Sequence, residues 1–135
     1  MAHTLIAQIV TPERIVYTNE VDMVVAPTIS GEVGILPLHA PLVGALRAGE
    51  VRVKSGNDWE WFAVSGGYIQ VHEDKVIILA DNAEAASQID VERARQAKTL
   101  AEERLAALSG EEDKSGEFDR DLRWAETRIS VGSKH

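Results

Sequence analysis

The sequence predicts an antiparallel β-sandwich or barrel followed by a C-terminal α-helical hairpin. Over the first eighty or so residues, short runs of β-branched and aromatic residues alternate with turn formers roughly every 8–12 residues, as in all-β domains. From about residue 90, apolar residues recur at intervals of three and four, the period of an amphipathic helix. The pattern changes within residues 79–90, so we place the domain boundary there and expect domains of residues 1–85 and 86–135.

Seven segments of the first domain are short and rich in residues that favour strands. In one of them Val51 and Val53 alternate with charged residues, which predicts one buried face and one solvated face. Pro12 and Pro27 end two others, because proline cannot donate to a β-ladder. The segments are 4–10, 14–17, 21–26, 50–54, 59–64, 68–72 and 75–80.

Residues 30–41 combine many turn formers with Val, Ile and Leu. One interpretation is a long crossover between sheets, in which Gly31 and Gly34 supply positive φ angles and the aliphatic residues tuck into the sandwich. The other is an exposed apolar loop that carries one carboxylate, Glu32, and docks onto a protein surface. The residues alone leave both open.

The second domain carries two apolar stripes with helical spacing. The breaker at 109–116 separates them and is short enough for an antiparallel hairpin. Alanines keep the first helix slim, and two helices alone bury little apolar surface, so the hairpin needs its own β domain or a partner protein to lie on. The first stripe is Ala94, Ala97, Ala101, Leu105 and Leu108; the second is Phe118, Leu122, Ala125 and Ile129.

The start of the first helix has a capping explanation and a ligand explanation. Asp90 can accept a hydrogen bond from the backbone of residue 92 or 93 as an N-cap, or Ser87 and Asp90 can form a capping box. Alternatively, Arg93 pairs with a phosphate, while Glu84 or Asp90 accepts from an amino group or a ribose hydroxyl.

Composition and missing motifs exclude several functions. The net charge of −8 argues against a nucleic-acid binder, which needs a basic face. No cysteine is present, and no apolar run approaches the roughly 18 residues of a membrane span, so we expect no direct membrane insertion. Phosphate-loop, nucleophile-elbow and zinc-protease signatures are missing, and the four histidines are scattered. We therefore expect a non-catalytic protein without a metal.

Three segments, in this order, resemble the epsilon subunit family of bacterial and chloroplast-type ATP synthases. They are residues 31–41, the turn at 64–68 and the helix start at 89–94. The resemblance implies a sandwich of about ten strands and a helical hairpin in the central stalk, which couples catalysis to proton flow without a catalytic residue. The implied location is the cytoplasmic face of the bacterial inner membrane, as a peripheral subunit.

The same resemblance implies partners for each domain. The sandwich would bind the gamma subunit and the c-subunit rotor ring, through Gly31, Glu32, Val33, Gly34 and His39. The hairpin would permit turnover when folded on the sandwich and block ATP hydrolysis when extended into the alpha/beta catalytic head. Arg120, Arg123 and Arg128 are our candidates for pairing with acidic segments of the head.

No cofactor is implied as required, but some bacterial members of the family bind ATP as a regulatory ligand. The positions that match their site here are Glu84, Ile89, Asp90, Arg93, Ala94 and Arg128. Leu100 stands where good ATP binders carry Arg, and Leu38 stands where the family commonly has Gly. The alternative function is a stand-alone ATP-sensing module. A small β-sandwich enzyme lacks any recognisable acid–base pair.

Overall fold

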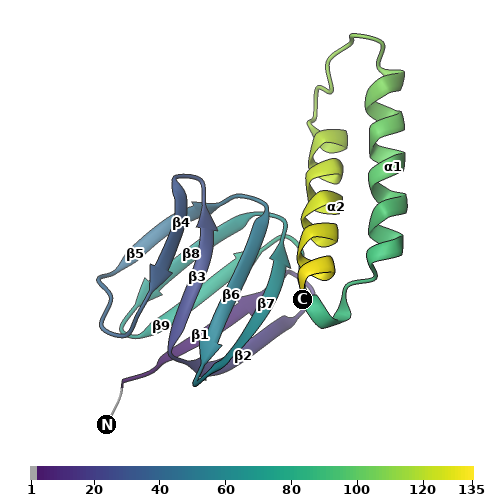
Figure 1. Ribbon diagram of the computed structural model, residues 1–135. Coiled ribbons are helices and arrows are strands. Elements are labelled where there is room, and N and C mark those ends of the chain that lie inside the picture. Colours follow the sequence, from purple (N-terminus) through teal and green to yellow (C-terminus); the bar gives the residue numbers. More distant parts are fainter. Residues whose placement is uncertain (1–2) are drawn as a thin grey trace.

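The computed structural model describes residues 3–135 and shows a β-sandwich with a helical hairpin projecting from one edge (Figure 1). The fold class predicted from the sequence is confirmed. The strands are β1 (Leu5–Val10), β2 (Ile15–Val21), β3 (Met23–Thr28), β4 (Gly31–Ile35), β5 (Leu42–Leu46), β6 (Gly49–Ser55), β7 (Asp58–Val64), β8 (Gly67–His72), β9 (Lys75–Ala80) and β10 (Ala83–Ala85). A 3₁₀ turn, η1 (Ala86–Gln88), leads into helices α1 (Val91–Ala107) and α2 (Glu117–Lys134).

The strands form two layers that meet at one point. Their order is β10-β7-β6-β3-β5-β8-β9-β1-β2. β4 pairs with β3 and lies outside this path. β3 and β5 pair only at Thr28 and Leu46, and this single pair is where the sheet bends from one layer into the other. All the pairings are antiparallel except that of β1 with β9.

The space between the layers is filled by the inward-facing residues of both. Val51 and Val53 are 0% and 2% exposed, which confirms the alternation predicted for β6. Tyr17 of β2 and Phe62 of β7 pack across the layers with their ring centroids 5.0 Å apart. Other fully buried residues include Leu5, Ile9, Val24, Ile35, Ile69, Val71 and Ile78. The packing of this core fixes the two layers relative to each other, and with them the side chains on their outer faces.

Residues 30–41 differ from both interpretations drawn from the sequence. β4 pairs with β3 along its whole length, from Thr28 opposite Gly31 to Val24 opposite Ile35, so residues 31–35 form a hairpin strand and the loop begins only after them. Gly31 has the expected positive φ of 123°. Gly34 does not; it lies in the strand, where a Cβ would stand 3.0 Å from the Met23 side chain.

Leu38 lies in the short loop that follows β4. Its φ is +66°, in the left-handed region that normally selects glycine, and its side chain is exposed. The Leu38 backbone N–H donates to Asp74 Oδ1 at 2.6 Å, which ties this loop to the turn between β8 and β9. The backbone conformation at Leu38 therefore agrees with the glycine that the family resemblance implies at this position.

The hairpin forms as predicted, with one shift in its buried face. Asp90 is the N-cap of α1 and accepts from the Arg93 backbone N–H at 3.0 Å, whereas Ser87 lies in η1 and forms no capping box. Ala94 and Ala101 are buried, but Ala97 is exposed and Lys98 takes its place, because the stripe follows the true helical period of 3.6 residues.

The end of α2 packs closely on the start of α1. A Cβ at Gly132 would stand 2.8 Å from Val91 Cγ2 and 2.9 Å from Ile89 Cγ2, so this glycine lets the helix approach the junction. Val131 of the same turn is fully buried. Figure 1 shows both helices rising away from the sandwich, so that the C-terminal end of α2 is the part of the helices that meets it.

Candidate interaction surfaces and nucleotide site

A small apolar cluster joins the hairpin to the sandwich. Ala63 of β7, Ala86 of η1 and Val131 of α2 are buried together. Trp61, Ile89 and Trp124 are partly buried around them. Ile89, one of the predicted ATP-site residues, is therefore packed against α2 at the base of the hairpin.

Glu84 and Arg128, both predicted site residues, are brought together by the fold. Arg128 Nε lies 2.7 Å from Glu84 Oε1, and the two side chains are only 18% and 28% exposed. The Nε–H is not directed at the carboxylate, so the contact is an ion pair and this buried nitrogen has no hydrogen-bond partner among residues 3–135. The guanidinium also lies over the Trp124 ring, 5.8 Å from its centroid. A hydrogen-bond donor therefore remains unused at the hairpin base.

The other predicted ATP-site residues have separate environments. The Asp90 carboxylate caps α1, which supports the capping explanation. Ala94 is fully buried. Arg93 is exposed, and its guanidinium forms no ion pair within the part of the chain that the structure describes. The structure thus joins Glu84 to Arg128 but leaves Arg93 in solvent.

Two hollows flank the Trp124 side chain. The one between the helices has a volume of about 140 Å³, and Leu100, Arg104, Asp121 and Arg128 are among its lining residues. The other, of about 220 Å³, lies at the sandwich edge beside Arg14 and Glu84. Each is smaller than the roughly 300 Å³ at which ligand pockets usually begin, so neither is a preformed nucleotide cavity.

The outer face of the layer formed by β5, β8, β9 and β1 carries a row of apolar residues. Ala45 lies opposite Tyr68, Tyr68 opposite Leu79, and Leu79 opposite Val10. Tyr68 and Leu79 are 61% and 48% exposed, and the row borders a hollow of about 600 Å³. Val43, on the same side of β5 as Ala45, is 75% exposed. An apolar surface of this kind is typical of a protein-binding face.

Sequence reasoning missed this row, because each strand contributes one residue to it. The available signal was an outward-facing apolar residue in each of four strands, but only the strand register shows that the four are neighbours.

The residues predicted to contact the rotor ring and gamma lie in β4 and in the loop that follows it. Gly31, Glu32, Val33 and Gly34 are in the strand itself, whereas His39 lies in the loop beyond its end. Glu32 Oε1 is 3.6 Å from Arg52 Nη2. The neighbouring turn between β3 and β4 exposes Ile29, whose exposed fraction is 70%. Four of the five predicted contact residues therefore lie on one strand.

The three arginines proposed to contact the catalytic head are in different situations. Arg120 and Arg123 lie toward the tip of the hairpin, where Arg120 Nη1 donates to the Ser115 carbonyl and Arg123 Nε donates to Asp119 Oδ2 at 2.8 Å. Both are exposed, whereas Arg128 is held by Glu84 at the base.

Neither a metal-binding cluster nor a membrane-spanning helix is found among residues 3–135. No group of three or more His, Cys, Asp or Glu side chains in this range is placed to hold a metal ion. None of the helices in this range has the length and hydropathy needed to cross a membrane.

Comparison with known families assigns both halves of the chain. Residues 4–86 match the ATP synthase delta/epsilon chain β-sandwich domain, and residues 87–131 match the long α-helix domain of the same chains. An ATP synthase epsilon chain from Desulforamulus reducens is 52% identical over 113 residues, which cover 84% of this chain and 86% of the relative. One from Halalkalibacterium halodurans is 47% identical over 131 residues, 97% of this chain and 98% of the relative.

Solved structures share the fold at lower sequence identity. A chain in the Euglena gracilis mitochondrial ATP synthase, in a structure described as OSCP/F1/c-ring, superimposes with a TM-score of 0.74 at 21% identity, covering 98% of this chain and 82% of that chain. A chain from the Tetrahymena thermophila enzyme, in a structure described as central stalk/c-ring, gives a TM-score of 0.62 at 13% identity, with coverages of 98% and 96%.

Proposed function

This chain belongs to the family of ATP synthase epsilon chains, and we propose that it is the non-catalytic central-stalk subunit that couples the catalytic head to the membrane rotor. The observation that carries the proposal is the family match over both halves of the chain. Residues 1–85 would then be the partner-binding sandwich and residues 86–135 the regulatory hairpin. Membership of this family favours the subunit role over a stand-alone ATP sensor.

The apolar row of Val10, Ala45, Tyr68 and Leu79 is the proposed docking surface for the gamma subunit. The hollow beside it is larger than either of those that flank Trp124, and its apolar lining suits the side chains of a partner helix. Exposing large apolar side chains to water is unfavourable. A partner that covers them stabilises the complex by about 25 cal/mol per Å² of apolar surface buried. A stalk subunit that rotates with its partner needs such a stable contact.

The turn between β3 and β4 is the proposed contact with the c-subunit ring. It presents the apolar side chain of Ile29 beside the carboxylate of Glu32, which supports binding to another protein surface. Docked there, the chain would lie at the cytoplasmic face of the membrane as a peripheral subunit, without crossing it. His39, at the other end of β4, would contact gamma.

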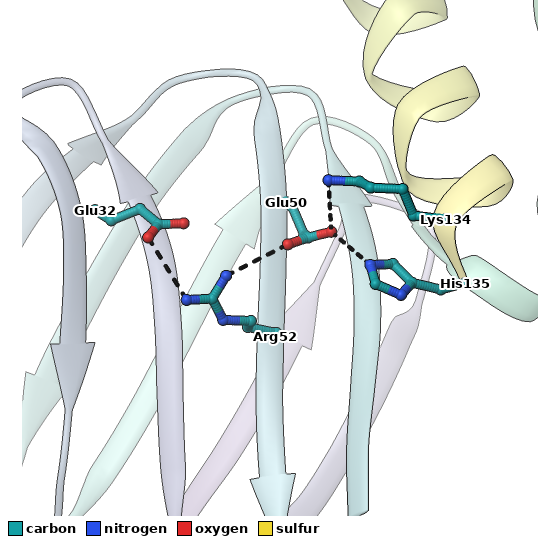
Figure 2. Close-up of polar contacts among 5 residues, drawn as sticks. All are labelled: Glu32, Glu50, Arg52, Lys134 and His135. Atoms are coloured by element: carbon teal, nitrogen blue, oxygen red, sulfur yellow. Dashed lines mark hydrogen bonds and ion pairs between the residues drawn. The ribbon is translucent and has the colours of Figure 1, made fainter.

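The hairpin is the proposed regulatory element, and the structure supports this through the size of its contact with the sandwich. Three buried residues, the Glu84–Arg128 pair and the contacts of Lys134 and His135 with Glu50 (Figure 2) hold the base, while most of both helices points away (Figure 1). A hairpin held by so few contacts can exchange between two positions that differ by a few kcal/mol. In this docked position Arg128 is occupied, so contact with the alpha/beta head requires it to leave Glu84.

Removing the hairpin should relieve inhibition of ATP hydrolysis. A complex assembled with the chain ended at Ala86 is expected to hydrolyse ATP roughly fivefold or more faster than one with the whole chain, since regulatory couplings are usually about 1–3 kcal/mol. The double variant Arg120→Ala, Arg123→Ala should relieve part of the inhibition, and the relief should be larger at low than at high ionic strength. Arg95→Ala on the exposed face of α1 is the matched control. Unchanged hydrolysis at every ATP concentration would exclude the regulatory role.

We propose ATP as a weak regulatory ligand at the hairpin base, with Glu84, Ile89, Asp90, Arg93, Ala94 and Arg128 at the site. The Arg128 guanidinium at this base supports this, because a guanidinium that leaves Glu84 can bind phosphate oxygens instead. The solvated Arg93 guanidinium is a second available donor. The small hollow and the lack of a cationic side chain at position 100 indicate that binding is weak.

Replacing Leu100 with Arg should therefore strengthen ATP binding. Leu100 is 45% exposed and shares the inter-helical hollow with Arg104 and Arg128, so an added guanidinium can reach a phosphate without being buried. Hydrogen bonds to charged groups contribute about 1.5–3 kcal/mol, so we expect roughly tenfold tighter binding or more in titration calorimetry. Leu100→Gln is the uncharged control, and Arg93→Ala should weaken binding. If Leu100→Arg leaves the affinity unchanged, the site lies elsewhere.

A further inference from the structure

Backbone strain is concentrated at one corner of the sandwich. Among residues 3–135, four residues other than glycine have positive φ, and three of them lie in two adjoining turns. Glu73 and Asp74 form the two-residue turn between β8 and β9, where positive φ is usual. Leu38 lies in the turn at residues 36–39, after a proline and with a φ of +66°. These are features of a type II turn, whose third residue is normally glycine, so a leucine there is strained.

Asp74 holds this strained residue in place. Its Oδ1 accepts from the Leu38 backbone N–H at 2.6 Å, and its carbonyl oxygen accepts from the Ile6 N–H at 2.9 Å. Asp74 therefore joins the loop after β4 to the start of β1. A left-handed conformation disfavours leucine by roughly five- to thirtyfold, and a hydrogen bond to a charged group offsets this by about tenfold or more. Because the two effects are of similar size, the turn at 36–39 depends on Asp74.

Large apolar side chains on the residues around this contact are exposed. The exposed fractions are 46% for Ile6, 55% for Leu36, 72% for Leu38 and 75% for Val43. We call these four residues the corner patch. Ile6 and Leu38 are the two residues that donate to Asp74, and Leu36 accepts the hydrogen bond that closes the turn. A strained turn that keeps leucines in water adds nothing to the core, whereas strain and exposed apolar groups together are typical of binding sites.

The corner patch continues the apolar row that we propose as the docking surface for gamma. Val43 lies on the same side of β5 as Ala45, a member of that row. Along β8, the row passes through Tyr68 and the turn with Asp74 follows His72, four positions or about 13 Å further on. An α-helix of about three turns spans that distance. A single helix of gamma lying along this face can therefore cover both the row and the corner patch.

We propose that Asp74 is a positioning residue for gamma binding, which holds the turn at 36–39 so that the corner patch forms a second contact with the gamma subunit. The inference rests on the proposed function in one respect, that gamma is the partner of this face. It adds a second contact and the residue on which the shape of that contact depends. Asp74 acts through the backbone of Leu38 and does not itself touch gamma.

Replacing Asp74 with Gly removes the acceptor but keeps the turn, because glycine adopts the positive φ of this position without strain. We expect the whole chain with this change to bind isolated gamma about tenfold more weakly in titration calorimetry. Its urea denaturation should remain cooperative. Asp74→Asn keeps an acceptor and should stay within about threefold of the unmodified affinity. Glu73→Gly removes the neighbouring carboxylate, which is paired with His72, and is the matched control that should bind normally.

Exchange of the Leu38 amide hydrogen, followed by NMR in the isolated chain, reports the positioning role directly. A hydrogen-bonded N–H exchanges only when its local structure opens. We expect the Leu38 amide to exchange about tenfold faster in Asp74→Gly and at the unmodified rate in Glu73→Gly. A residue that only contacts gamma would not change this rate. The same rate in Asp74→Gly and the unmodified chain would show that Asp74 does not hold the turn and would overturn the proposal.

A double-mutant cycle with Leu38→Gly separates positioning from direct contact. Glycine removes the strain at position 38, so the turn depends less on Asp74. Leu38→Gly alone should weaken gamma binding by about tenfold, because an apolar side chain leaves the interface. Adding Asp74→Gly should then weaken binding by no more than about twofold further. A full tenfold loss from Asp74→Gly in both backgrounds would mean that the carboxylate binds gamma itself, and the positioning role would be wrong.

Charges placed in the corner patch distinguish this proposal from the function on which it rests. The double variant Leu36→Asp, Leu38→Asp should bind gamma about tenfold more weakly or worse. If it binds normally while Tyr68→Asp with Leu79→Asp abolishes binding, gamma remains the partner and only this proposal fails. If it loses the c-subunit ring in co-purification instead, the patch belongs to that partner and the proposal is also wrong. If the unmodified chain does not bind gamma, the proposed function itself fails.

Discussion

Replacing Tyr68 and Leu79 together with Asp is expected to abolish binding of the gamma subunit. The two side chains are neighbours on β8 and β9 and make up the most exposed part of the apolar row. Burying one large apolar side chain contributes about 1.5–3 kcal/mol, and an unpaired carboxylate at the same place adds a desolvation cost. We expect the affinity to fall by roughly a hundredfold or more, measured by co-purification and by titration with isolated gamma.

A second variant tests whether the effect belongs to this face. Ile29→Asp changes a side chain of comparable exposure, in the turn between β3 and β4 that we assign to the rotor ring. It should leave gamma binding intact. If both variants bind gamma equally well, the apolar row is not the docking surface. If the unmodified chain does not co-purify with gamma at all, the stalk-subunit role itself is wrong.

The strands that could be predicted from the sequence are those whose pattern is local. Val51 and Val53 alternate with charged residues, so β6 is visible without its neighbours. β4 and β5 were missed because glycines at 31, 34 and 44 interrupt their apolar pattern, and β10 is only three residues long. In β4 and β5 the pairing with longer strands, not local propensity, determines the structure.

The same distinction applies to the site. The Asp90 cap joins residues three positions apart and could be predicted from spacing alone. The Glu84–Arg128 pair joins residues far apart in the chain; family resemblance nominated both residues for one site, but spacing could not place one beside the other. The contact between His135 and Glu50 had no sequence signal, because it depends on where the end of α2 meets β6.

Replacing Gly67 with Ala is expected to destabilise the sandwich more than the same change at any of its other glycines. Gly67 begins β8 and pairs with both Leu46 and Ala80, so it is held from two sides. Its φ is +133°, in a region that residues with a Cβ rarely adopt, and a Cβ there would overlap the Leu79 carbonyl oxygen and stand 2.9 Å from Ala80 Cα. These contacts are backbone atoms of a central strand, which cannot move aside without breaking the ladder.

The expected loss in the free energy of unfolding is about 3–5 kcal/mol, from the strained backbone and the overlap together, measured by urea denaturation. Gly56→Ala separates the two causes: its φ is +64° but no atom lies within 4 Å of the added Cβ, so it should cost only about 1 kcal/mol. Equal losses in both variants would mean that backbone strain alone matters. Because Gly67 directly precedes Tyr68 and lies against Leu79, its replacement should also displace the apolar row and weaken gamma binding, even under conditions where the sandwich stays folded.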